Sequence, residues 1–136
     1  MEEVLEAYAA AVRAKDVEAF LALYADDVRT FDLWSVWSYD GKGALRAMVE
    51  EWFGSLADDE VVAVEFDEVR VHEGNGVSAV DAFAKYAAVA PDGTEIRSLN
   101  NRLTWVLSRD GDTWKIVHEH TSAPAGEGGK VSLKRS

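Results

Sequence analysis

The chain has 136 residues, of which 25 are acidic and 14 basic, so that its net charge is −11. This charge argues against a nucleic-acid partner and against anionic membrane surfaces, because both are themselves negatively charged. Cysteine is absent, which excludes disulfides, thiolate nucleophiles and zinc–cysteine sites. The first residues are acidic where a secretory signal would be basic, so we expect a cytoplasmic protein.

Helical periodicity dominates the first third of the chain. Apolar side chains recur every three or four residues from Val4 to Val12, which predicts an N-terminal helix. Asp16 has the character of an N-cap for a second, short helix. The stretch "VRTFDLW" then reads as extended, and a third helix is predicted from about Lys42 to Leu56.

The remainder of the chain has the two-residue period of strands. The segment "EVVAVEFDEVRVHE" alternates and then changes parity, which predicts a β-bulge near Asp67. Turn signals separate it from "NGVSAVDAFAKYAAVA", "TEIRSLNNRLTWVLS" and "TWKIVHEHTS". Three tight turns in succession predict an antiparallel meander, whose buried face only the preceding helices can cover. We therefore expect an α+β fold with a curved antiparallel sheet wrapped around three N-terminal helices.

The last predicted strand carries two of the three histidines. Strict alternation places one set of side chains on a single face: Trp114, Ile116, His118, His120 and Ser122. That face begins apolar and ends polar, which is typical of a pocket wall. The residues between them, which include Glu119 and Thr121, are assigned to the opposite face.

The closing pattern of the chain resembles that of a known superfamily. The residues that carry the resemblance are Arg102, Asp110, Gly111, Trp114, Val117, His118, His120, Ser122 and Pro124. They are similar to the nuclear transport factor two-like superfamily, in particular its SnoaL-like group and the association domain of calcium/calmodulin-dependent kinase II. The resemblance covers residues 1–124 and implies one cone-shaped domain, followed by a flexible tail at 125–136. Such domains include isomerases, cyclases, dehydratases, epoxide hydrolases and binding modules without catalysis.

The opening pattern "AYAAAVRAKDVEAFLALYADDVRTFD" is similar to that of the steroid Δ5-3-ketoisomerases. This resemblance implies an oxyanion-hole role for Tyr8 and a general-base role for Asp32. Asn101 falls where that family has a protonated aspartic acid, and its amide can donate a hydrogen bond but cannot titrate. Leu33 departs from the family's proline after the base.

Asp32 is also a candidate base on its own chemistry. It lies between Phe31 and Trp34, and an apolar mouth raises the pKa of a carboxylate towards neutrality. His118 and His120 leave three interpretations open. They are a metal pair completed by His72 or Asp32, an acid–base partner of Asp32, or polar groups that close the pocket.

A set of candidate ligand-binding residues surrounds these groups. Arg102 pairs either with a small carboxylate ligand or with Glu119 or Asp81 on the outer sheet face. The aromatic loop "WSVWSYDG" either stacks on a flat ligand or covers a dimer interface. The full set is Trp34, Trp37, Tyr39, Trp52, Phe53, Arg102, Thr104, Trp105 and Ser122.

The functional hypothesis is an isomerase, cyclase or dehydratase that moves protons without a cofactor or metal. Its substrate would be a small, flat molecule with a carbonyl group, or one like a polyketide. The alternative is a non-catalytic module of the same fold that binds a small acid or oligomerises. We expect a homodimer through the open sheet face, with no nucleic-acid or membrane partner.

Overall fold

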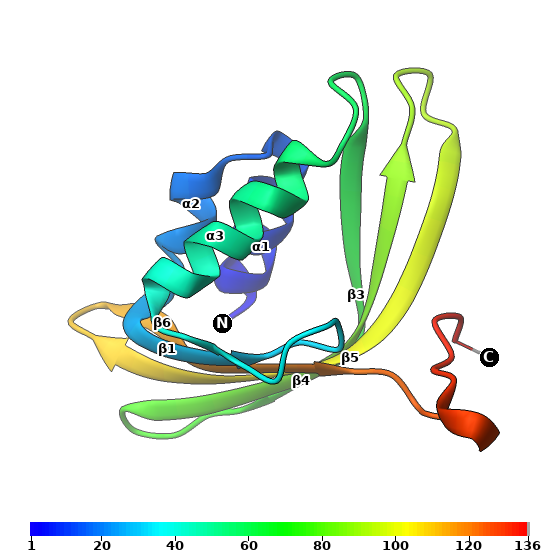
Figure 1. Ribbon diagram of the computed structural model, residues 1–136. Helices are drawn as coiled ribbons and strands as arrows, with labels where there is room; N and C mark the ends of the chain where they lie inside the picture. The colour runs from blue at the N-terminus through cyan, green and yellow to red at the C-terminus, as the bar shows by residue number, and fades with distance from the viewer. Residues whose placement is uncertain (136) are drawn as a thin grey trace.

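The computed structural model describes residues 1–135 as helices packed into the hollow of a curved sheet (Figure 1). Its helices are α1 (Glu2–Ala14), α2 (Val17–Leu21) and α3 (Lys42–Gly54), with a short 3₁₀ turn, η1 (Glu127–Gly129). Its strands are β1 (Tyr24–Phe31), β2 (Tyr39–Asp40), β3 (Val61–His72), β4 (Val77–Val89), β5 (Glu95–Asp110) and β6 (Thr113–Ser122). The prediction of an α+β fold is confirmed.

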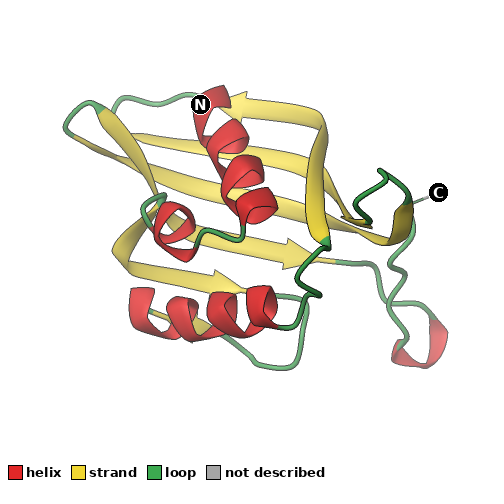
Figure 2. Cartoon of the chain, turned by 90° about the horizontal axis from the view of Figure 1, so that it is seen from above, coloured by secondary structure: helices red, strands yellow, loops and turns green. Residues whose placement is uncertain are grey.

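The strands form one sheet in the order β2-β1-β6-β5-β4-β3, and it does not close into a barrel. The predicted meander from β3 to β6 is antiparallel throughout. The expectation of a wholly antiparallel sheet is wrong for one pair, because β1 runs parallel to β6. A parallel neighbour requires a long crossover connection, which α3 and the meander supply here. All three helices lie on the same, concave side of the sheet (Figure 2).

The helices form where the sequence predicts them. Asp16 is the N-cap of α2, and its side chain accepts a hydrogen bond from the backbone N–H of Ala19 at 3.0 Å. The apolar stripe of α1 is buried against the sheet from Val4 to Val12. On the sheet side, Trp105, Leu107 and Ile116 are completely buried. This core occupies one end of the hollow and leaves the other end to polar side chains.

Two bulges decide which residues face the helices. The predicted bulge in β3 is confirmed, because the register with β4 shifts between Asp67 and Arg70 and Glu68 has a φ of 50°. A second bulge lies in β6. Leu107 pairs with Ile116, but the preceding Val106 pairs with His118, so that one residue of β6 is left over. Inward and outward positions of β6 are therefore exchanged after Ile116.

This exchange overturns the predicted face of the histidines. Glu119 and Thr121 are buried on the concave side, whereas His118 is half-buried and His120 exposed. The physical reason is the extra residue, which moves every later side chain of the strand to the opposite face. The prediction that both histidines line the concave face is wrong.

Residues after β6 turn back along β5. β6 ends at Ser122, and beyond that point β5 has a different neighbour. The backbone N–H of Asn100 in β5 donates to the carbonyl of Leu133 at 2.7 Å. The guanidinium of Arg135 lies 4.0 Å from the centre of the Phe83 ring and pairs with Asp67 at 2.8 Å. The structure therefore shows contacts of this segment with the sheet, while its flexibility stays a prediction.

Candidate functional site

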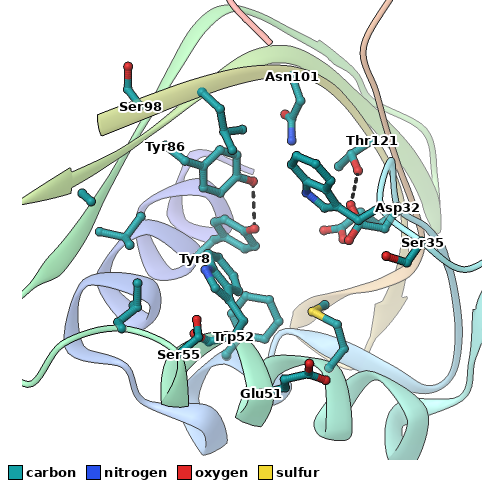
Figure 3. A pocket seen from close by; sticks show the side chains of 18 of the residues that line it. Tyr8, Asp32, Ser35, Glu51, Trp52, Ser55, Tyr86, Ser98, Asn101 and Thr121 are labelled. Atoms are coloured by element: carbon teal, nitrogen blue, oxygen red, sulfur yellow. Dashed lines mark hydrogen bonds between the residues drawn. The ribbon is translucent and has the colours of Figure 1, made fainter. Parts of the chain in front are cut away.

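A cavity of about 480 Å³ opens between the helices and the polar end of the concave sheet face (Figure 3). This volume is within the usual range for sites that enclose small molecules. The lining residues are Tyr8, Phe20, Asp32, Trp34, Ser35, Tyr39, Met48, Glu51, Trp52, Ser55, Leu56, Val62, Tyr86, Ala88, Arg97, Ser98, Leu99, Asn101, Glu119 and Thr121. Aromatic and apolar side chains share this lining with polar and charged ones, among them Glu51, Arg97 and Glu119.

The structure brings together the three residues assigned by resemblance to catalysis. Tyr8 reaches the cavity from α1, Asp32 from the end of β1, and Asn101 from β5. Figure 3 shows Asp32 on one side of the cavity and Tyr8 on the other, with Asn101 projecting between them. Their catalytic roles stay predictions, but their convergence on one hollow is a feature of the fold.

Asp32 is half-buried and oriented by two hydrogen bonds to one of its oxygens. The Thr121 hydroxyl donates to Oδ1 at 2.8 Å, and the backbone N–H of Leu33 donates to the same atom at 2.9 Å. These contacts fix the carboxylate while Oδ2 is left for other partners. The side chain of Thr121 is in this position because of the β6 bulge.

Two tyrosine hydroxyls in the cavity wall are in hydrogen-bond contact. Tyr8 Oη and Tyr86 Oη are 2.9 Å apart, and in such a pair one hydroxyl donates to the other. The proton of the accepting hydroxyl is then free to point into the cavity. Burial raises the pKa of Tyr8 and of Tyr86 well above the ordinary value, so both stay protonated near neutral pH. The pair is therefore a hydrogen-bond donor for a ligand oxygen.

Asn101 lies on the inner face of β5, 8% exposed. Its Oδ1 is buried without a hydrogen-bond partner among the described residues. Figure 3 shows its amide nitrogen directed into the cavity. A buried polar atom without a partner is uncommon in folded proteins. The amide nitrogen, on the cavity side, is the part of Asn101 that a ligand oxygen can reach.

Glu119 is a part of this site that the sequence did not reveal. Its Oε1 accepts hydrogen bonds from the Tyr24 hydroxyl at 2.7 Å and from Trp105 Nε1 at 2.9 Å. Burial raises the pKa of the Glu119 carboxyl, the two hydrogen bonds oppose this, and the nearby charge of Asp32 raises it further. Strict alternation assigned Glu119 to the outer face, and the bulge moves it inward.

The raised pKa of Glu119 has a consequence for stability. A carboxyl whose folded pKa lies above its unfolded value stabilises the protein fully below the unfolded value, 4.5, and loses this contribution as pH rises through the folded value. The free energy of unfolding should therefore fall over that window in the wild type. Glu119→Gln should remove this component from chemical-denaturation curves measured between pH 4 and 8.

The matched control for this measurement is Glu73→Gln, which removes an exposed carboxylate in the turn after β3. It should leave the pH dependence of unfolding nearly as it is in the wild type. Identical pH dependence in the wild type and in Glu119→Gln would contradict the assignment of a buried acid.

Several predicted site residues lie outside the cavity. His118 Nδ1 is 2.8 Å from the backbone oxygen of Arg29, and the His120 ring packs edge-on against Phe31 at 5.5 Å between ring centroids. Both contacts are on the convex face. His72, the suggested third metal ligand, does not join the other two histidines. Its Nε2 is 3.0 Å from Asp81 Oδ2. Within residues 1–135, no group of three or more metal-type ligands comes together.

The arginine expected to bind an acid is also on the convex face. Arg102 Nε donates to Ser122 Oγ at 3.0 Å. Thr104, two residues further along β5, is exposed. The suggested Arg102–Glu119 pair is wrong, because these two side chains are on opposite faces of the sheet. Arg102 and Ser122 line a separate, shallower hollow of about 190 Å³ next to the C-terminal segment.

The aromatic residues divide into three groups. Trp34, Tyr39 and Trp52 line the cavity, as the sequence predicts for ligand-stacking residues. The prediction that Phe53 and Trp105 line the cavity is wrong, because both are buried in the core behind the cavity wall. The prediction that Trp37 binds a ligand in the cavity is wrong for a different reason. It is 97% exposed in the loop before β2.

Comparisons with known proteins agree with this architecture. Residues 1–126 match the family model described as a SnoaL-like domain. A nuclear transport factor two-like protein of unknown function from Pseudomonas putida has 26% identity and a TM-score of 0.86, over 99% of this chain and 92% of that chain. No curated protein shows a significant match.

Two further solved structures are similar at lower identity. A cystatin-like protein of unknown function from Nostoc punctiforme has 14% identity and a TM-score of 0.72, over 88% of this chain and 85% of that one. A candidate calcium/calmodulin dependent protein kinase II association domain from Xanthomonas campestris has 15% identity and a TM-score of 0.71, over 90% and 84%. At this identity the similarity shows the fold alone. No helix within residues 1–135 has the length and apolar character needed to cross a membrane.

Proposed function

The chain belongs to the SnoaL-like domain family, and on that premise we propose that it catalyses proton transfer next to a carbonyl group of a small, flat molecule. The observation that carries this proposal is the Asp32 carboxylate facing a buried tyrosine hydroxyl pair across an apolar cavity. A base and an oxyanion donor on opposite sides of one ligand are the two groups that enolisation needs.

The proposed reaction uses each of these contacts. Asp32 accepts a proton from the carbon next to the carbonyl, and the C–H electron pair becomes the double bond of an enolate. The carbonyl oxygen takes the negative charge and accepts a hydrogen bond from the free proton of the Tyr8–Tyr86 pair. Asn101 donates to the same oxygen from β5. Asp32 then returns the proton to carbon, and no cofactor takes part.

The aromatic walls define the kind of substrate. Trp34, Trp52 and Tyr39 offer flat surfaces for stacking, and Met48 adds a flexible apolar contact. These walls favour a flat ring system as the substrate. The alternative of a small-acid binder assigned the acid to Arg102 and the histidines, all of which lie outside this cavity.

The proposal is tested with 2-tetralone, a flat ketone with acidic benzylic protons. In D₂O, the wild-type protein should accelerate loss of the benzylic proton signal in NMR spectra by about 100-fold over buffer. 2-Naphthol, which imitates the enolate, should inhibit competitively. A rate equal to that of buffer, or of heat-denatured protein, would argue for a binding module instead.

We also propose a homodimer through the convex face of the sheet. Half-buried apolar side chains there, which include Phe31 and Val106, lie beside His118 and form a surface that a second copy would cover. Sedimentation velocity should give the mass of two chains at micromolar concentration, and Val106→Glu should shift the protein to one chain. A wild type that sediments as a single chain at every concentration would contradict the dimer.

A further inference from the structure

The two oxygens of Glu119 have different surroundings. Oε1 is held by Tyr24 and Trp105, at 2.7 and 2.9 Å. Oε2 has no hydrogen-bond partner within residues 1–135. The surrounding protein does not enclose this atom completely, so it remains accessible. Since Glu119 is otherwise buried and lines the cavity, Oε2 is the atom that a ligand meets.

Burial and the charge of Asp32 favour the neutral form of this carboxyl, whereas the hydrogen bonds from Tyr24 and Trp105 favour its ionised form. Tyr8, Tyr24 and Tyr86 face it from α1, β1 and β4, and Asp32 is the nearest carboxylate. Burial raises the pKa of Glu119, and the charge of Asp32 adds to this. Tyr24 and Trp105 direct their protons at Oε1, so a proton of the carboxyl itself belongs on Oε2. The geometry therefore offers Glu119 Oε2 as a position for a proton beside the cavity, in addition to the carboxylate of Asp32.

The spacing of the two carboxyl groups suits a single substrate. Glu119 and Thr121 are two residues apart on β6, about 7 Å along an extended strand, and Thr121 holds Asp32. This is the spacing of Cα atoms along the strand, and two adjacent substrate carbons with a contact of about 3 Å at each end span a distance of the same order. The base and the acid can therefore act on adjacent carbon centres of one molecule.

A third group distinguishes between reaction types. Exchange or shift of a proton next to a carbonyl needs a base and an oxyanion donor, which Asp32 and the Tyr8–Tyr86 pair supply. An additional acid is superfluous for that reaction. It is required when an oxygen substituent on the next carbon has to leave, because hydroxide is a poor leaving group unless it is protonated.

We propose that Glu119 donates its proton to a leaving hydroxyl, so that the substrate is a β-hydroxy ketone and the reaction a dehydration. This inference rests on the proposed function, because it begins with the enolate that Asp32 forms.

The atoms and electrons balance without an oxidant or reductant. Asp32 takes the proton from the α-carbon and the enolate forms. The enolate pair then becomes the double bond between the α- and β-carbons as the β-carbon–oxygen bond breaks. The proton on Glu119 Oε2 passes to the departing oxygen, which leaves as water. Asp32 is then protonated and Glu119 ionised, and exchange with solvent restores both.

Two probes with one ring skeleton separate the two steps. Exchange of 2-tetralone uses only the base and the oxyanion donor. Dehydration of 4-hydroxy-2-tetralone also needs the acid, and its product, 2-naphthol, is fluorescent. Glu119→Gln keeps an oxygen for Tyr24 and Trp105 but has no proton to transfer. The ratio of the dehydration rate to the exchange rate should fall by about 20-fold or more in this variant, because only dehydration needs the missing proton.

The pattern across variants tells the two proposals apart. Asp32→Asn should lose both reactions. If Asp32→Asn retains exchange, the proposed function fails. The role of Glu119 fails in two cases, both with Asp32→Asn inactive in the two reactions. In the first, Glu119→Gln retains dehydration. In the second, Glu119→Gln loses dehydration and exchange equally while its melting temperature is unchanged. Wild-type protein that exchanges 2-tetralone but does not dehydrate its hydroxy derivative would also overturn the assignment of the substrate class.

A pH profile gives an independent readout. Dehydration by the wild type should decline as pH rises through the raised pKa of Glu119, whereas exchange should not follow that decline. Glu119→Gln should lack this limb. Profiles of the same shape for both reactions in the wild type would contradict a protonated acid at this position.

Discussion

Replacement of Asp32 by asparagine is expected to slow the deuterium exchange of 2-tetralone by about 100-fold, to the rate in buffer, because the positioned general base is lost. Asparagine keeps the oxygen that accepts from Thr121 and from the Leu33 N–H, so the local structure should be retained. What it lacks is the ability to take a proton. The rate should therefore fall while the dissociation constant of 2-naphthol, measured by direct binding, changes little.

Asp27→Asn is the matched control for this experiment. Asp27 is an exposed carboxylate on the same strand, β1, and does not line the cavity. It should retain the wild-type exchange rate within a factor of two. Equal rates for Asp32→Asn and Asp27→Asn would remove Asp32 as the base.

Truncation of Trp105 to alanine is expected to have the largest effect on stability, about 3–5 kcal/mol for loss of a buried tryptophan. Trp105 is completely buried, and its ring packs against Tyr8 and Phe66 at centroid distances of 5.5 and 6.0 Å. Its Nε1 also donates to Glu119, which would lose one of its two protein donors. The cavity left behind and the weakened polar contact act in the same direction.

Trp37→Ala provides a control with the same chemistry. Trp37 is 97% exposed, so its truncation should change the free energy of unfolding by less than about 0.5 kcal/mol. Urea denaturation followed by circular dichroism measures both variants. A loss below about 1 kcal/mol for Trp105→Ala would contradict the packing and the contact described here.

The sequence was sufficient for the architecture because its periodicities are local. The stripe of α1 and the alternation of β3 predict their own burial, and the change of parity from Phe66 to Val69 revealed the bulge in β3. The parallel pairing of β1 with β6 was not predictable in this way. It joins residues 89 to 92 positions apart, and neither strand carries a local signal for its neighbour.

The candidate site was predictable only in part. Resemblance placed Tyr8, Asp32 and Asn101 correctly in one cavity. The bulge in β6 was missed because polar residues follow it on both faces, so no apolar side chain marks the change of parity. The adjacent apolar pair Ile116 and Val117 was the one available hint.

The missed bulge had chemical consequences. Glu119 and Thr121 occupy the inward positions that strict alternation gave to His118 and His120. The cavity wall therefore carries a buried acid and the hydroxyl that orients Asp32, in place of two imidazoles. Tyr86 was missed as well, because a tyrosine within an alternating strand looks like any half-buried aromatic residue. Its partnership with Tyr8 exists only in three dimensions.

The most direct test of the account is a crystal structure of the wild-type protein with 2-naphthol. The account predicts the ring between the aromatic walls of the cavity, its oxygen within hydrogen-bond distance of the Tyr8–Tyr86 pair, and the Asp32 carboxylate over the adjacent carbon. A ring bound on the convex face beside His118 and His120, or an oxygen directed away from both tyrosines, would contradict it.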